Sequence, residues 1–231
     1  MPVPGVRPAK RVLNVYYLLD TSGSMAEDGK IAALNQAVRQ TIPKLKQVES
    51  LHPGIEINIL VTKFSTTASW HINPGIRLSD LNWRDLEAGG ATAMGSAIAL
   101  VVEDLNTGLP KRALPPLLVL VTDGSPTDDF DGAIAELRDS AWGQKSVRIA
   151  IGVGPKEVVL WDKLQLFMFG MKPKPLHATN AVELVEYIKW ASTTGANYAT
   201  TVAKSGEGET GQDDWMPSLP LIEFEKSDIW A

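Results

Sequence analysis

The chain has 231 residues, of which 44% are hydrophobic, and this size favours one α/β domain with a substantial core. It has no cysteine, which excludes disulfides, thiolate metal sites and cysteine nucleophiles and fits a cytoplasmic protein. The formal net charge is −5, without a long basic run, so we expect no nucleic-acid partner. No stretch approaches the roughly 20 apolar residues that cross a bilayer, and the N-terminus lacks the apolar segment of a signal peptide. We therefore expect no membrane partner either.

The first third of the chain predicts two strands separated by a helix. Residues 12–20 are almost continuously apolar, which is typical of a strand that is covered on both faces. From residue 30 to about 50, apolar residues recur every three or four positions, as in an amphipathic helix. Residues 55–64 predict a second strand, and residues 68–72 a short edge strand.

The pattern continues along the rest of the chain. Apolar residues at helical spacing predict a helix over about 94–105, and residues 115–124 predict a second buried strand. The sequence then predicts a helix over 131–140, a strand over 147–153 and a last helix over 181–192 that extends to about 201. Residues 156–169 are ambiguous, and we favour a helix there. Strands that alternate with helices form right-handed crossovers, so we expect a three-layer, mostly parallel sheet with helices on both faces and one antiparallel edge strand.

Composition divides the chain into three parts. We expect an N-terminal arm over residues 1–10, the domain over 11–203 and a Gly-, Pro- and acid-containing tail over 204–231. Trp215 and Trp230 lie between acidic residues of this tail. Exposed aromatic residues in such surroundings suggest a docking peptide.

Two of the predicted strands end in an aspartate followed by small polar residues. Asp20 opens "DTSGS", which includes Ser22 and Ser24, and Asp123 opens "DGS". Between them, the stretch "AGGATAMGSA" places Thr92 just before a helix. Ligands of an open parallel sheet bind beyond the carboxyl ends of its strands. If the two strands are neighbours, the three loops converge.

The convergent groups are carboxylates and hydroxyls, without sulfur or imidazole. Such oxygen ligands suit a hard cation, with Mg²⁺ expected and Mn²⁺ or Ca²⁺ possible. Three hydroxyls leave coordination positions for water and for one external oxygen. Local alternatives remain open: the serines or Thr92 can cap a helix, and Asp128 and Asp129 can form either an acidic rim or a solvated turn.

This pattern resembles the von Willebrand factor A domain with its metal-ion-dependent adhesion site, or MIDAS. The family's D-x-S-x-S motif stands here as Asp20, Ser22 and Ser24, its later threonine matches Thr92, and the aspartate of its T-D-G sequence matches Asp123. The resemblance implies a Rossmann-like fold and a Mg²⁺ ion bound by the serines and Thr92, with the aspartates acting largely through coordinated waters. It also implies a partner protein whose Asp or Glu completes the coordination.

Three stretches carry a narrower resemblance. "VYYLLDTSGSM", "GGAT" and "VTDGSPTDD" are similar to stand-alone bacterial A-domain proteins of the tellurium-resistance type. Such proteins are associated with a protein kinase and a PP2C-type protein phosphatase. This resemblance implies a non-enzymatic adaptor in a cytoplasmic stress-response or phospho-signalling complex.

An enzyme is the alternative, because a buried strand ending in an aspartate also opens several phosphotransfer active sites. A Mg²⁺-dependent phosphohydrolase of the Asp-x-Asp type would need a second acid two residues after Asp20, where Ser22 stands. The sequence contains no phosphate-binding G-x-x-x-x-G-K-[ST] loop and no G-x-S-x-G elbow. We therefore expect no enzyme activity.

Overall fold

A central six-stranded sheet organises the computed structural model, which describes residues 10–73, 76–110, 112–171, 174–205 and 230. The sheet order is β3-β2-β1-β4-β5-β6, and all pairs are parallel except the antiparallel edge pair of β2 and β3. The strands are β1 (Arg11–Asp20), β2 (Ile55–Phe64), β3 (Ala68–Ile72), β4 (Leu117–Thr122), β5 (Val147–Val153) and β6 (Leu176–Ala178).

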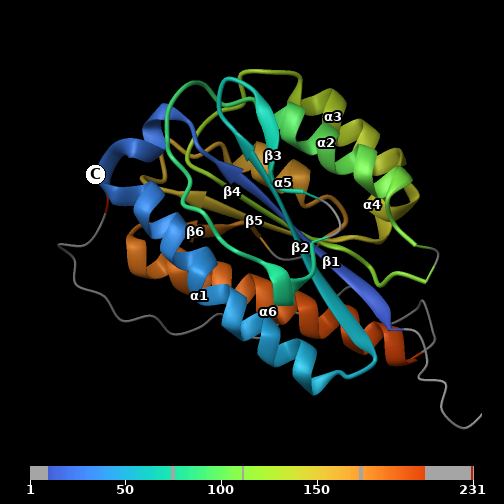
Figure 1. The fold of residues 1–231 in the computed structure, drawn as a ribbon. Helices are drawn as coiled ribbons and strands as arrows, with labels where there is room; N and C mark the ends of the chain where they lie inside the picture. The colour runs from blue at the N-terminus through green and yellow to red at the C-terminus, as the bar shows by residue number, and fades with distance from the viewer. Residues whose placement is uncertain (1–9, 74–75, 111, 172–173, 206–229, 231) are drawn as a thin grey trace, which may run out of the picture.

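Helices cover both faces of the sheet and complete a three-layer α/β fold. Figure 1 shows α1 and α6 side by side on one face, and α2, α3 and α4 on the other. The α-helices are α1 (Lys30–Leu51), α2 (Met94–Thr107), α3 (Phe130–Asp139), α4 (Ala141–Lys145), α5 (Trp161–Phe167) and α6 (Ala181–Ser205). Two 3₁₀ segments, η1 (Gly23–Gly29) and η2 (Leu78–Asp80), lie in the connections. No helix in the described ranges is both long and apolar enough to span a membrane.

Strand β1 faces a separate hydrophobic core on each side because successive side chains of a strand point to opposite faces. Tyr17 and Leu19 belong to the core under α1 and α6, whereas Tyr16 and Leu18 belong to the core under α2 and α3. The Tyr17 hydroxyl lies 2.6 Å from the Ser192 hydroxyl oxygen and joins β1 to α6. Because both faces are buried, β1 is apolar between its charged ends except at Asn14, which is the pattern that predicted it.

The register of β1 brings two loops to the same edge of the sheet. Asp20 pairs with Phe64 of β2, and the residue before it, Leu19, pairs with Val121 of β4. The last residue of β1 and Asp123, the first residue after β4, therefore emerge together. The condition stated for the converging loops, that the two strands are neighbours, is confirmed.

The expected elements are present, and the structure differs from the prediction in the ends of some helices and in several short elements. The region 156–169 is helical only over α5, and α6 extends beyond the predicted end of the last helix to Ser205. The pattern missed η1, η2, α4 and β6, because elements of three to seven residues are too short to show a period.

Trp230 packs into the domain and is not an exposed aromatic residue, so that expectation was wrong. It is buried in the core under α1 and α6. Its backbone N–H donates to the Thr179 carbonyl at 2.7 Å, and its indole Nε1–H donates to the Asp28 carbonyl at 2.9 Å. Asp28 belongs to η1, so Trp230 holds the segment that leads from the D-x-S-x-S motif into α1. Trp215 and the acids of residues 206–229 lie outside the described residues.

We expect Trp230→Ala to lower the free energy of unfolding by about 3–5 kcal/mol, since it removes a large buried side chain. Trp230→Phe keeps most of the apolar contact but loses the indole donor to Asp28, and should cost about 1 kcal/mol. Urea unfolding followed by circular dichroism measures both. Wild-type stability in the alanine variant would show that the Trp230 contact is not formed in solution.

Candidate functional site

Asp20 is a fully buried carboxylate that the surrounding backbone holds in place. Its Oδ1 accepts a hydrogen bond from the Ser22 N–H at 2.8 Å, and its Oδ2 accepts one from the Thr122 hydroxyl. Burial, with a smaller contribution from the charge of Asp123, raises the pKa of Asp20 to about 6 against the lowering effect of these hydrogen bonds. A negative charge at this position is therefore costly without a nearby positive charge.

The two serines connect this region to Asp123. The Ser22 and Ser24 hydroxyl oxygens lie 3.1 Å apart, and the Ser24 hydroxyl donates to Asp123 Oδ1 at 2.7 Å. The backbone between them is fixed by its neighbours, because Gly23 N–H donates to the Gly90 carbonyl at 2.9 Å. Gly90 itself has φ +89°, and a Cβ there would lie 2.5 Å from the Thr66 hydroxyl oxygen. A glycine is thus required where the two loops meet.

Thr92 faces the same cluster and does not cap α2, although capping was an open alternative. The N-cap residue of α2 is Ala93, without a side-chain cap. A Cβ built on Gly124 would lie 3.5 Å from the Thr92 hydroxyl oxygen, so this hydroxyl faces the loop that follows Asp123. Among the residues that the structure describes, the Thr92 hydroxyl makes no hydrogen bond, which leaves it available as a ligand.

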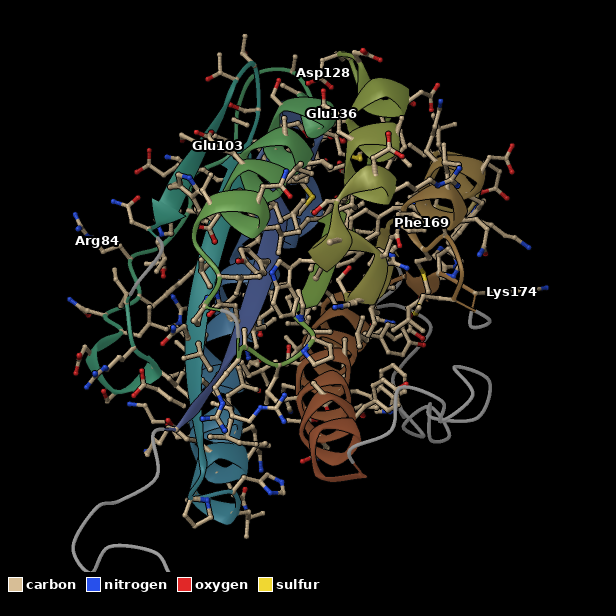
Figure 2. All side chains as sticks on the ribbon, turned by 90° about the vertical axis from the view of Figure 1, so that its right-hand side faces the viewer. Arg84, Glu103, Asp128, Glu136, Phe169 and Lys174 are labelled. Atoms are coloured by element: carbon tan, nitrogen blue, oxygen red, sulfur yellow. The ribbon has the colours of Figure 1, made fainter. Side chains whose placement is uncertain are left out.

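Asp128 and Asp129 are helix caps rather than an acidic rim or a solvated turn. Asp128 accepts hydrogen bonds from the backbone N–H groups of Gly95 and Ser96 at 2.8 and 2.7 Å and from the Ser96 hydroxyl at 2.7 Å. Asp129 accepts one from Gly132 N–H at 3.0 Å at the start of α3. Figure 2 shows Asp128 at the end of the molecule where α2 and α3 begin. Asp128 supplies the cap that Thr92 would otherwise have to provide.

Lys30, the first residue of α1, is a member of the cluster that the sequence reasoning missed. Its Nζ lies 3.0 Å from Asp123 Oδ2, and both side chains are buried. A lysine in the first turn of an amphipathic helix normally reads as a solvated residue. The signal was weak: Lys30 directly follows Gly29, whose φ of +73° is a conformation that glycine favours.

The donor set fits a hard divalent cation. The five predicted residues lie at one edge of the sheet. Hydrogen bonds join Asp20 to Ser22, Ser22 to Ser24 and Ser24 to Asp123. Thr92 lies beside Gly124, the residue that follows Asp123. Within the described part of the chain, no group of three or more His, Cys, Asp and Glu side chains is arranged to hold a metal ion. The remaining oxygen atoms at this edge are the hydroxyls of Ser22, Ser24 and Thr92, and a hard cation accepts such neutral oxygens as ligands.

Comparisons with solved structures support the fold. A von Willebrand factor type A protein from Catenulispora acidiphila matches at 18% identity and a TM-score of 0.59, over 81% of this chain and 43% of that one. Proximal thread matrix protein 1 from the mussel byssus, solved with a zinc-occupied MIDAS motif, matches at 14% identity and a TM-score of 0.58, over 81% of this chain and 46% of that one. Manganese-loaded Plasmodium vivax TRAP protein matches at 19% identity and a TM-score of 0.54, over 78% and 74%.

The chain spans less than half the length of the first two of these structures. A comparison with curated proteins gave no match. The sequence model of the von Willebrand factor type A domain matches residues 14–205, which is most of the chain and includes all five candidate residues. Together with the three-layer sheet described above, this match shows that the chain belongs to the von Willebrand factor type A domain family.

Proposed function

We propose that this chain is a non-enzymatic, divalent-metal-dependent protein-binding domain that captures an Asp or Glu side chain of a partner. The observation that carries the proposal is the continuous set of oxygen atoms from Ser22 through Ser24 to Asp123, beside the buried carboxylate of Asp20. Relatives of the same fold with zinc or manganese bound give further support. Mg²⁺ is the proposed cation, with Mn²⁺ or Ca²⁺ as alternatives.

In this cluster, the hydroxyl groups and the carboxylates would have different roles in binding a cation. Ser22, Ser24 and Thr92 would offer neutral oxygen atoms as direct ligands. Asp20 and Asp123 would supply negative charge, and Asp123 would also orient the Ser24 hydroxyl. A bound cation supplies electrostatic attraction for an external carboxylate, and neutral ligands weaken this attraction less than direct carboxylate ligands would. The protein thereby provides a directional site for one acidic side chain.

We propose the same cellular setting that the narrower resemblance implies. The chain would act as an adaptor in a bacterial, cytoplasmic stress-response or phospho-signalling complex of the tellurium-resistance type, over a domain of residues 11–203. A protein kinase or a PP2C-type phosphatase is the proposed partner. The support is the likeness of "VYYLLDTSGSM", "GGAT" and "VTDGSPTDD" to that group. A pull-down from bacterial lysate with and without a chelator, followed by mass spectrometry, tests it.

The first prediction concerns the serines. We expect one saturable site for Mg²⁺, Mn²⁺ or Ca²⁺ in calorimetric titration of chelator-treated protein, and a loss of at least about tenfold in affinity in the Ser22→Ala, Ser24→Ala double variant. Ser125 lies in the loop that follows Asp123, but it is exposed and is not one of the five candidate residues, so Ser125→Ala should bind metal like the wild type.

Ser22 and Thr92 are both buried, so a substitution at either position can also affect folding. Unfolding of the metal-free variants must therefore be measured beside binding, and we expect a cost of only about 1 kcal/mol for each lost serine hydrogen bond. Equal metal affinity in the double variant and the wild type would contradict the site.

The second prediction concerns pH. The pKa of folded Asp20, about 6, lies above that of an unfolded aspartate, so its ionisation costs stability as the pH rises through about 6. A cation favours the ionised form. We therefore expect Mg²⁺ to raise the Tm more at pH 7.5 than at pH 5, relative to choline chloride of equal ionic strength. An equal shift at both pH values would count against binding beside Asp20.

The third prediction tests the enzyme alternative. Both carboxylate oxygens of Asp20 already accept hydrogen bonds from the protein, and the residue is fully buried, so neither oxygen is presented to a phosphate group. We expect no Mg²⁺-dependent hydrolysis of a generic aryl phosphate above the level of an Asp20→Ala variant. Turnover that disappears in this variant would establish a phosphohydrolase instead.

A further inference from the structure

Lys30 places a buried positive charge beside the candidate metal cluster. The residue is 5% exposed, and its Nζ lies 3.0 Å from Asp123 Oδ2. The amino group is also enclosed by the end of β5, since a Cβ built on Gly154 would lie 3.6 Å from Nζ. Burial of an ammonium group is costly unless an opposite charge accompanies it. The charge of Lys30 therefore affects how strongly a cation binds at the neighbouring cluster.

The Lys30 side chain is tied to the cluster and, within the described residues, to nothing else. Its one hydrogen bond there is to Asp123 Oδ2, while Ser24 donates to the other oxygen of the same carboxylate. An ammonium group has three N–H donors. Two of them have no acceptor in the described part of the protein, so the charge of Lys30 is only partly satisfied by its partner.

A count of formal charges shows what this lysine does to a bound cation. Asp20 and Asp123 bring two negative charges and Lys30 brings one positive charge, so the cluster has a net charge of one negative. A divalent cation leaves the loaded cluster with one excess positive charge. Without Lys30, the two carboxylates alone would neutralise the cation. An uncompensated charge in buried surroundings is unfavourable, and one external carboxylate removes it.

We propose that Lys30 makes the cation and the external carboxylate depend on each other for binding. Its charge weakens binding of the cation alone and strengthens binding of the cation together with a carboxylate. The inference rests on the proposed function and adds the residue that sets its selectivity for an anionic ligand. Because coupling between two ligands is reciprocal, the cation should raise carboxylate affinity by the same factor.

The test is a calorimetric titration of Mn²⁺ into metal-free protein, with and without acetate, at constant ionic strength and pH 7.5. Free Mn²⁺ is corrected for its own acetate complex. In the wild type, acetate should tighten Mn²⁺ binding at least about fivefold. Lys30→Gln should bind Mn²⁺ about tenfold more tightly without acetate, because a repelling charge is removed, and should lose most of the acetate effect.

Three further variants separate charge from packing. Lys30→Arg retains the positive charge and should retain the acetate effect. Lys63→Gln removes an exposed lysine near the carboxyl end of the neighbouring strand β2, and should leave both the Mn²⁺ affinity and the acetate effect unchanged. Lys30→Met replaces the side chain by an apolar one of similar length and should behave like Lys30→Gln.

The outcomes distinguish the two proposals. Wild-type Mn²⁺ affinity and acetate effect in a folded Lys30→Gln variant would overturn the role of Lys30 while leaving the metal site intact. Failure of both Lys30→Gln and Lys30→Met to fold, judged by circular dichroism, would make Lys30 a structural residue and would also overturn it. No Mn²⁺ binding by the wild type, with or without acetate, would refute the metal site itself and the inference with it.

Discussion

Two aspartates at the carboxyl ends of neighbouring parallel strands force negative charge into the interior of this domain. Asp20 and Asp123 are both buried, and the polar groups around them stabilise their carboxylates by hydrogen bonds. The Ser22 backbone and the Thr122 hydroxyl donate to one carboxylate, while the Ser24 hydroxyl and the Lys30 ammonium donate to the other. The connections after β1 and β4 are arranged by these interactions as much as by apolar packing.

The long buried strands and the candidate cluster could be predicted from the sequence because their signals are local. The buried strands of a parallel sheet read as apolar runs, and an aspartate at the end of such a run is visible without any knowledge of the fold. The adjacency of β1 and β4, which the cluster needs, could only be stated as a condition. The family resemblance supplied the order of the ligands, not their contacts.

The remaining features depend on contacts between distant parts of the chain. Asp128 caps a helix that begins 34 residues earlier, at Met94, and frees Thr92 from that role. Lys30 has the pattern of a surface lysine, and only the fold brings it to Asp123. Trp230 lies in a polar, acidic context that reads as exposed. Neither periodicity nor propensity contains this information, since each reports only on near neighbours in sequence.

The packing of Trp230 also bears on where the folded unit ends. The family match stops at residue 205, yet the Asp28 carbonyl receives its hydrogen bond from a residue 202 positions away. A fragment cut at the end of α6 would keep every candidate ligand but would lose the packing of Trp230 against η1. The loop that leads from Ser24 to Lys30 would then face solvent on that side. The family match thus ends before the packed core does, and only a unit that includes Trp230 keeps this loop enclosed.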